Sequence, residues 1–189
     1  MRFNCIRKFW LSTILILSFI SGYSQNENDI WYFGEFAGVT FASGSPIALL
    51  DGTTNHWEGV TSISDGAGTL LFYSDGITVW DATHAPMPNG LGLMGDWSAT
   101  QSATAVRKPG NPNIYYIFTV PNLGGAAGLR YSEIDMTLNF GLGDITATKN
   151  ILLQTDISEK VSVVRHSIGT DFWVIAQSSL NNTFYVYLV

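Results

Sequence analysis

The pattern of hydrophobic and polar positions is clearest between Val60 and Asp81, in the stretch VTSISDGAGTLLFYSDGITVWD. Val60 to Ser64 alternates apolar and hydroxyl side chains, which is typical of a half-buried strand. The apolar run Leu70 to Tyr73 lies between two short turns that contain Asp-Gly, where Gly adopts positive φ at no steric cost. Turns this short join antiparallel neighbours. The stretch therefore predicts a three-stranded meander whose middle strand is covered on both faces.

The same order of strands and turns recurs along the chain. Copies of this pattern span residues 30–50 (the least regular), 60–82, 103–135 and 161–189. The middle strands of the last two copies are the apolar runs Ile114 to Phe118 and Phe172 to Ala176. The longer interval between them contains an additional predicted strand, Ile151 to Gln154.

Repeats of this kind predict an all-β fold, a β-propeller-like array of antiparallel meanders with about three to four blades. A single meander cannot bury both faces of its middle strand, whereas meanders stacked side by side can. The alternative is a β-sandwich built from the same strands, but sandwiches use longer connections that cross between sheets. The local connections within each copy favour the propeller-like array.

Known propellers have roughly four to eight blades, so we expect the repeats to form an incomplete propeller. The last predicted strand, Thr183 to Val189, is aromatic, uncharged and free of proline. Such a strand at the edge of a sheet offers unpaired backbone groups to another chain. We therefore expect self-association through the edge strand Thr183 to Val189.

The first 24 residues are predicted to be a secretory signal peptide. Arg2, Arg7 and Lys8 form a basic head, an apolar run follows, and small residues precede the expected cleavage between Ser24 and Gln25. The apolar run is shorter than the roughly 20 residues that a membrane-spanning helix needs. We expect a propeller-like β domain over residues 25–189, with no membrane span after cleavage, that is secreted to the extracellular space or the cell surface (to the periplasm if a sorting domain is absent).

Removal of this segment makes the composition more acidic and leaves no cysteine. Six Lys and Arg remain against fifteen Asp and Glu, a net charge of −9, which disfavours nucleic-acid binding. Cys5 is the only cysteine of the chain, so the mature domain has no disulfide, thiol nucleophile or thiolate metal ligand. A domain of this length is consistent with one core region.

The sequence offers few candidates for chemistry. Gly90 to Gly95 matches GxGxxG, but the surrounding prolines predict a loop rather than the strand and helix of a dinucleotide site. His56, His84 and His166 are far apart in the sequence, and the Asp-Gly pairs at 51, 65 and 75 are interpreted as turns. Glu133 and Asp135 share one face of a predicted strand and are interpreted as solvated charges at a strand edge. We expect no catalytic, cofactor-binding or metal-binding residues and no cofactor.

Several segments resemble the N-terminal propeller-like region of large secreted surface proteins of Bacteroidetes. The resemblance is carried by NDIWYFGEFAGVTF, GTLLFYSDGITVWDATHAPMPNG, TQSATAVRKPGNPNIYYIFTV and GLRYSEIDM. Those proteins are similar to gliding-motility-associated cell-surface proteins, often with PKD-type domains and a type IX secretion signal. We expect this chain to lack such downstream parts, and the resemblance implies no catalytic residues.

The sequence thus predicts a non-catalytic extracellular or cell-surface module for binding or adhesion, the N-terminal part of a larger secreted protein. Its expected partner is an unidentified extracellular glycan or protein. The alternative is a fragment of a secreted glycan-active propeller enzyme whose acidic residues converge in space rather than in sequence.

Overall fold

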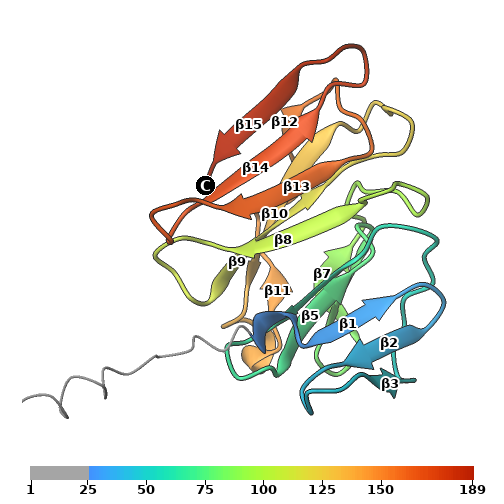
Figure 1. Cartoon of the computed structure of the whole chain (residues 1–189), viewed down its shortest axis with the longest axis vertical. Helices are drawn as coiled ribbons and strands as arrows, with labels where there is room; N and C mark the ends of the chain where they lie inside the picture. The colour runs from blue at the N-terminus through green and yellow to red at the C-terminus, as the bar shows by residue number, and fades with distance from the viewer. Residues whose placement is uncertain (1–25) are drawn as a thin grey trace, which may run out of the picture.

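The computed structural model describes residues 26–189, so the predicted signal peptide and its cleavage between Ser24 and Gln25 lie outside the described residues. The described chain is all-β, with two short 3-10 turns, η1 (Asn26–Asn28) and η2 (Asn139–Gly141), and no α-helix. Its strands form four antiparallel sheets, which confirms the predicted fold class at this level. Figure 1 shows the sheets following one another along the molecule in chain order.

The four sheets are named first to fourth along the chain. The first sheet consists of β1 (Ile30–Phe33), β2 (Ala37–Thr40) and β3 (Ile47–Leu49). The second consists of β4 (Thr61–Ser64), β5 (Leu70–Ser74), β6 (Thr78–Asp81) and β7 (Pro86–Leu91). The third consists of β8 (Ala103–Arg107), β9 (Ile114–Thr119), β10 (Leu129–Asp135), β11 (Asp144–Ile145) and β12 (Ile151–Gln154). The fourth consists of β13 (Val161–Arg165), β14 (Phe172–Gln177) and β15 (Phe184–Leu188).

Hydrophobic residues are buried in three separate clusters, each between two consecutive sheets. Tyr32 and Tyr73 belong to the cluster between the first and second sheets. Phe72 and Ile117 belong to the one between the second and third sheets, and Phe118 and Val174 to the one between the third and fourth. The core is therefore distributed over sheet junctions, as expected when meanders are stacked side by side.

The middle strands of the second and third sheets are buried on both faces, as the sequence predicted. In β5, Phe72 faces the third sheet while the adjacent Tyr73 faces the first. In β9, Ile117 packs toward the second sheet and Phe118 toward the fourth. This alternation follows from the two-residue period of a strand. These two strands thus lack a polar face because a neighbouring sheet packs against each side of them.

The first strands of the sheets also lie beside one another. β1 contacts β4, β4 contacts β8, and β8 contacts β13. Four sheets joined in this order differ from the two facing sheets of a β-sandwich, the alternative fold. Within residues 26–189 the array is open, since the first and fourth sheets lie at opposite ends (Figure 1).

One sequence interpretation of local structure needs correction, and another is confirmed. No strand was predicted over Pro86–Leu91, and its last two residues, Gly90 and Leu91, belong to the segment interpreted as a loop, but these residues form β7 and pair with β6. Prolines are tolerated there because β7 is an edge strand of the second sheet and does not need every backbone N–H for pairing. The predicted additional strand Ile151–Gln154 is confirmed as β12, and it pairs with β10.

Candidate functional site

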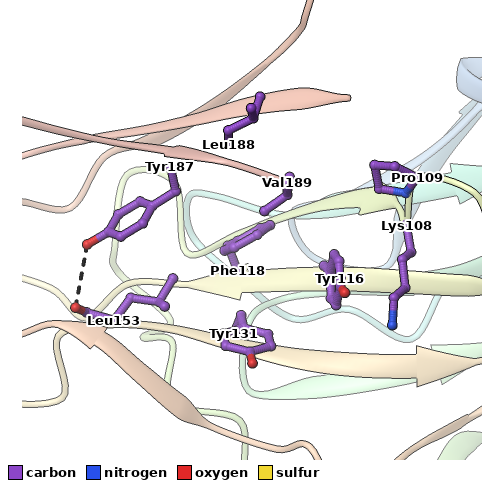
Figure 2. A pocket seen from close by; sticks show the side chains of 9 residues that line it. All are labelled: Lys108, Pro109, Tyr116, Phe118, Tyr131, Leu153, Tyr187, Leu188 and Val189. Atoms are coloured by element: carbon purple, nitrogen blue, oxygen red, sulfur yellow. Dashed lines mark hydrogen bonds between the residues drawn. The ribbon is translucent and has the colours of Figure 1, made fainter. Parts of the chain in front are cut away.

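A pocket lies between the third and fourth sheets and has a volume of about 470 Å³. We call it the aromatic pocket. Its lining residues are Lys108, Pro109, Tyr116, Phe118, Tyr131, Leu153, Tyr187, Leu188 and Val189 (Figure 2). Small-molecule sites usually measure about 300–1,000 Å³ and combine an apolar lining with a few polar groups. The aromatic pocket has both the size and the lining of such a site.

Strand alternation brings the aromatic rings of the pocket together. Tyr116 and Phe118 point to the same face of β9, and Tyr131 of β10 lies opposite Phe118 in the register of the two strands. The Tyr116 and Tyr131 rings meet edge to face, with centroids 5.8 Å apart at 87°. From the fourth sheet, the Tyr187 hydroxyl donates to the carbonyl oxygen of Leu153 at 3.5 Å (Figure 2). Three tyrosines from three strands therefore surround one cavity.

A charged pair lies at one end of the pocket. The Lys108 ammonium is 3.0 Å from a carboxylate oxygen of Glu133 and 5.3 Å from the centroid of the Tyr116 ring. The hydrogen bond to Glu133, followed by that to Tyr116, raises the pKa of Lys108. The Lys108 side chain is 38% exposed, so its remaining N–H donors are accessible to a ligand. The pocket thus offers aromatic faces for stacking and a cation beside them.

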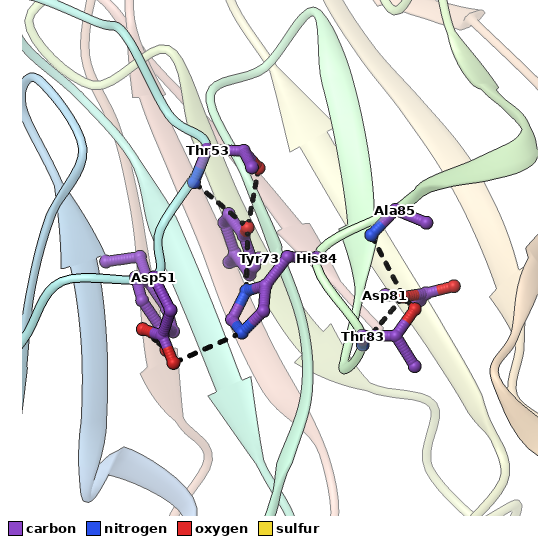
Figure 3. Close-up of polar contacts among 8 residues, drawn as sticks. Asp51, Thr53, Tyr73, Asp81, Thr83, His84 and Ala85 are labelled. Atoms are coloured by element: carbon purple, nitrogen blue, oxygen red, sulfur yellow. Dashed lines mark hydrogen bonds and ion pairs between the residues drawn. The ribbon is translucent and has the colours of Figure 1, made fainter.

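A second polar cluster joins the first and second sheets (Figure 3). The hydroxyl of the fully buried Tyr73 contacts the Thr53 hydroxyl at 2.7 Å and His84 Nδ1 at 3.1 Å. His84 Nε2 lies 3.5 Å from the carboxylate of Asp51, which also accepts a hydrogen bond of 2.8 Å from Tyr32. Each of the polar side chains in this network has a partner.

The turn after β6 presents His84 to this cluster. One carboxylate oxygen of Asp81 accepts hydrogen bonds from the backbone N–H groups of Thr83 and Ala85 and from the Thr83 hydroxyl. His84, between them, has a φ of 67°, a left-handed conformation that is uncommon for residues other than Gly. The tight turn at Asp81 therefore fixes the imidazole in position.

The tyrosines of this cluster are held in the neutral form. Burial raises the pKa of Tyr73, and burial together with the hydrogen bond to Asp51 raises the pKa of Tyr32. A neutral phenol serves as a hydrogen-bonding group rather than as a base. These hydrogen bonds connect residues of the first sheet and the loop after it to residues of the second sheet.

The structure places most of the candidate residues in structural roles. His166 accepts the N–H of Ile168 in a turn, and His56 is buried and accepts the N–H of Glu58. Asp65 and Asp75 accept backbone N–H groups within their own turns, as predicted. Asp51 does not, because the loop after β3 carries it to Tyr32 and His84; the interpretation of Asp51 as a turn residue was wrong.

The interpretation of Glu133 as a solvated strand-edge charge was also wrong. β10 is an interior strand that pairs with β9, β11 and β12, so Glu133 is not at an edge. Its side chain is only 19% exposed and is paired with Lys108. Asp135, two residues further, accepts hydrogen bonds from the N–H and hydroxyl of Thr137 in the following turn.

The GxGxxG segment is part strand and part loop. Gly90 and Leu91 end β7, and the segment then runs beside the β5–β6 turn, with Leu93 and Gly95 donating to the carbonyls of Ile77 and Gly76. No helix follows it in the described chain.

The aromatic pocket was not predicted. Its signal in the sequence was the aromatic residues at every second position of β9 and β15, namely Tyr116 with Phe118 and Tyr185 with Tyr187. The two strands are distant in sequence, and only the packing of the third sheet on the fourth brings these side chains together.

Among residues 26–189, no group of three or more His, Cys, Asp or Glu side chains is arranged to hold a metal ion. Over the same residues, no helix has the length and hydrophobicity that crossing a membrane requires. No family model, curated protein or solved structure matches the chain.

Proposed function

We propose that the chain is a non-catalytic binding module of propeller-like architecture, and that its ligand occupies the aromatic pocket. The observation that carries the proposal is the convergence of Tyr116, Tyr131 and Tyr187 beside the Lys108 ammonium. The successive sheets with adjacent first strands support the propeller-like arrangement.

The chemistry of the pocket suits a sugar or a peptide with an exposed apolar group. Aromatic rings offer flat apolar faces, and the tyrosine hydroxyls and Lys108 supply hydrogen bonds at the margin. Glu133 already neutralises Lys108, so an uncharged or amphipathic ligand requires no burial of an unpaired charge. We propose a glycan as the ligand, with a protein segment as the alternative class.

The alternative of a glycan-active enzyme needs two carboxyl groups facing one substrate. Glu133 is bound to Lys108, and Asp135 accepts hydrogen bonds from its own turn. This use of both carboxylates supports binding rather than hydrolysis. Turnover of a glycan that Glu133→Gln abolishes would establish the enzymatic alternative instead.

We further propose that the module acts outside the cytoplasm, after cleavage between Ser24 and Gln25. The basic head and apolar run of the first 24 residues support export. Amino-terminal sequencing of exported protein is expected to begin at Gln25, free or cyclised. A product that retains Trp10 would contradict the cleavage.

A glycan array followed by calorimetric titration tests the binding proposal. Tyr131→Ala removes a ring from the pocket, and Lys108→Met removes the ammonium while keeping most of the aliphatic chain. Loss of a stacking ring costs about 1–3 kcal/mol by analogy with other aromatic platforms, so we expect affinity to fall about tenfold or more in Tyr131→Ala.

Phe140→Ala is the matched control, because Phe140 is a fully exposed aromatic residue outside the pocket. It is expected to bind the ligand like the unaltered chain. Near-ultraviolet circular dichroism checks that each variant is folded. A ligand whose affinity is the same in Tyr131→Ala, Lys108→Met and the unaltered chain would refute the aromatic pocket as its site.

A further inference from the structure

The two ends of the array expose sheet faces of the kind that are buried elsewhere in the molecule. In the fourth sheet, alternate residues such as Val174 and Tyr187 pack toward the third sheet. The other half of the strand positions points away from it. The apolar residues at these positions, which we call the fourth-sheet outer face, are Val164, Trp173, Ile175, Phe184, Val186 and Leu188. Leu188 is the last residue of β15 and also borders the aromatic pocket.

The fourth-sheet outer face is continuous across the three strands. Val164 lies opposite Trp173, which lies opposite Leu188 in the register of the sheet. Val186 is 52% exposed and Phe184 61% exposed. Contiguous exposed apolar surface of this kind is typical of an interaction site.

The first sheet has a comparable face at the other end of the molecule (Figure 1). Tyr32 points toward the second sheet, so the alternate positions of the first sheet point away. These positions, which we call the first-sheet outer face, are Trp31, Phe33, Ala37, Val39 and Ala48. Trp31 is 50% exposed, and its indole N–H already donates to the carbonyl of Asn28 at 2.8 Å, so its free surface is apolar.

Neither face carries a charge. None of the outward-pointing strand residues in the first or fourth sheet is Asp, Glu, Lys or Arg, although the chain contains fifteen acidic and nine basic residues. Monomeric proteins rarely expose large contiguous apolar patches. The two uncharged faces instead resemble the inner junctions, where Tyr32 stacks on Tyr73 and Phe72 meets Tyr115 edge to face.

We propose that two copies of the chain associate head to tail, the fourth-sheet outer face of each packing on the first-sheet outer face of the other. Such a contact joins two different surfaces and forms a ring if the rotation closes. Two copies of the four sheets give eight, which is within the roughly four to eight blades of known propellers. A second copy is the favoured occupant because one chain supplies both uncharged faces, at opposite ends. The inference rests on the propeller-like arrangement in the proposed function but not on the aromatic pocket.

Light scattering coupled to size-exclusion chromatography tests the association of the purified chain over about 1–100 µM. We expect a dimer. Val186→Lys on the fourth-sheet outer face and Phe33→Lys on the first-sheet outer face are each expected to give monomers, because a lysine would be buried against an apolar surface. Leu180→Lys is the matched control: Leu180 is 81% exposed in the β14–β15 loop, outside both faces, and the variant should remain a dimer.

Mixing the two variants distinguishes head-to-tail packing from other modes. The Val186→Lys chain keeps an intact first-sheet outer face, and the Phe33→Lys chain keeps an intact fourth-sheet outer face. The mixture is therefore expected to form a heterodimer through one intact junction. A contact between two fourth-sheet faces, or edge pairing of β15, would leave Phe33→Lys dimeric and would overturn the proposal.

A cross-linking experiment gives an answer even if a lysine variant does not fold. In a Cys5→Ser background, Ala48→Cys marks the first-sheet outer face and Val186→Cys the fourth-sheet outer face. A bis-maleimide that spans about 10 Å, the spacing of packed sheets, should link the two chains to each other when they are mixed. It should not link either chain to itself.

Three outcomes would each refute the two-copy ring: absence of the mixed cross-linked product, a monomer at every concentration, or open assemblies that grow with concentration. If Tyr131→Ala dimerises like the unaltered chain, the dimerisation result does not depend on whether the aromatic pocket binds a ligand.

Discussion

The ring of Tyr32 in β1 stacks on the ring of Tyr73 in β5, with centroids 4.6 Å apart and an interplanar angle of 29°. This stack lies at the junction between the first and second sheets. The two hydroxyls reach different partners. Tyr32 donates to Asp51, whereas Tyr73 contacts Thr53 and His84 (Figure 3). The junction therefore combines ring stacking with a polar network.

Tyr73→Phe tests how much this network contributes. The substitution keeps the stacked ring but removes the hydroxyl that Thr53 and His84 contact. Leaving part-buried polar groups without a partner costs about 1–3 kcal/mol, and we expect the free energy of unfolding in urea to fall by that amount. Tyr131→Phe is the control, because the Tyr131 hydroxyl makes no hydrogen bond within residues 26–189. Equal stability of the two variants would show that the Tyr73 hydroxyl is dispensable.

Gly76 is expected to be intolerant of any side chain. It lies in the β5–β6 turn with a φ of 88°, and a Cβ placed there would collide with the hydroxyl and backbone carbonyl of Ser102, which precedes the third sheet. Gly76→Ala should therefore destabilise the fold by about 2 kcal/mol or more, from backbone strain and steric overlap together. Gly66→Ala is the control, since Gly66 has open space around it and no positive φ. Thermal unfolding compares the two. A melting temperature of Gly76→Ala equal to that of Gly66→Ala would contradict this account.

The strands that the sequence predicted best are those whose pattern is local. The alternation at Val60 to Ser64 and the Asp-Gly turns around Leu70 to Tyr73 specify a hairpin without help from distant residues. β7 was missed because its prolines are compatible with a strand only at the edge of a sheet, and edge position is a property of the assembled sheet.

The candidate sites depend on contacts between distant parts of the chain. Tyr116 and Tyr187 approach the same cavity only because the third sheet packs on the fourth. Glu133 was interpreted as solvated because the neighbours of its strand were unknown. In the structure β10 is an interior strand, and Lys108, which directly follows β8, is paired with the Glu133 carboxylate. Asp51 was interpreted as a turn residue because Asp-Gly favours turns, but the loop after β3 brings it to His84.

Asp144 links the second and third sheets and should be sensitive to substitution. It is 8% exposed, and its two carboxylate oxygens accept the backbone N–H and side-chain amide of Asn89 in β7, each at 2.7 Å. Asp144→Ala leaves these donors without their charged partner, and hydrogen bonds to charged groups contribute about 1.5–3 kcal/mol. We expect a loss of stability of about that size in urea unfolding.

Asp135→Ala is the matched control for Asp144→Ala. Its carboxylate is bonded to Thr137 within one turn and joins no second sheet. We expect a smaller loss, of about 1 kcal/mol or less, as for other local caps. If Asp135→Ala proved as destabilising as Asp144→Ala, the junction between β7 and β11 would not be the reason for the effect.

Glu159 provides an acid-sensitive link between the third and fourth sheets. One carboxylate oxygen accepts the N–H of Leu123 at 2.9 Å, and the other accepts the N–H and hydroxyl of Thr100 at 3.1 and 3.2 Å. The bond from Leu123, followed by that from Thr100, lowers the pKa of Glu159. A carboxyl group whose pKa is lower in the folded than in the unfolded state adds stability above its unfolded pKa, which is about 4.3 for Glu. That contribution is lost as the pH falls through the folded value.

Glu159→Gln removes the charge and with it this pH dependence. We therefore expect the unaltered chain to be more stable than Glu159→Gln at pH 7, and the difference to shrink as the pH is lowered below about 4. Urea unfolding at a series of pH values from 7 to the acid limit of reversible folding measures this difference directly. Glu58→Gln, which removes an exposed carboxylate that lies outside this link, is the control. A difference between Glu159→Gln and the unaltered chain that stayed constant at every pH would show that the carboxylate acts through its shape and not through its charge.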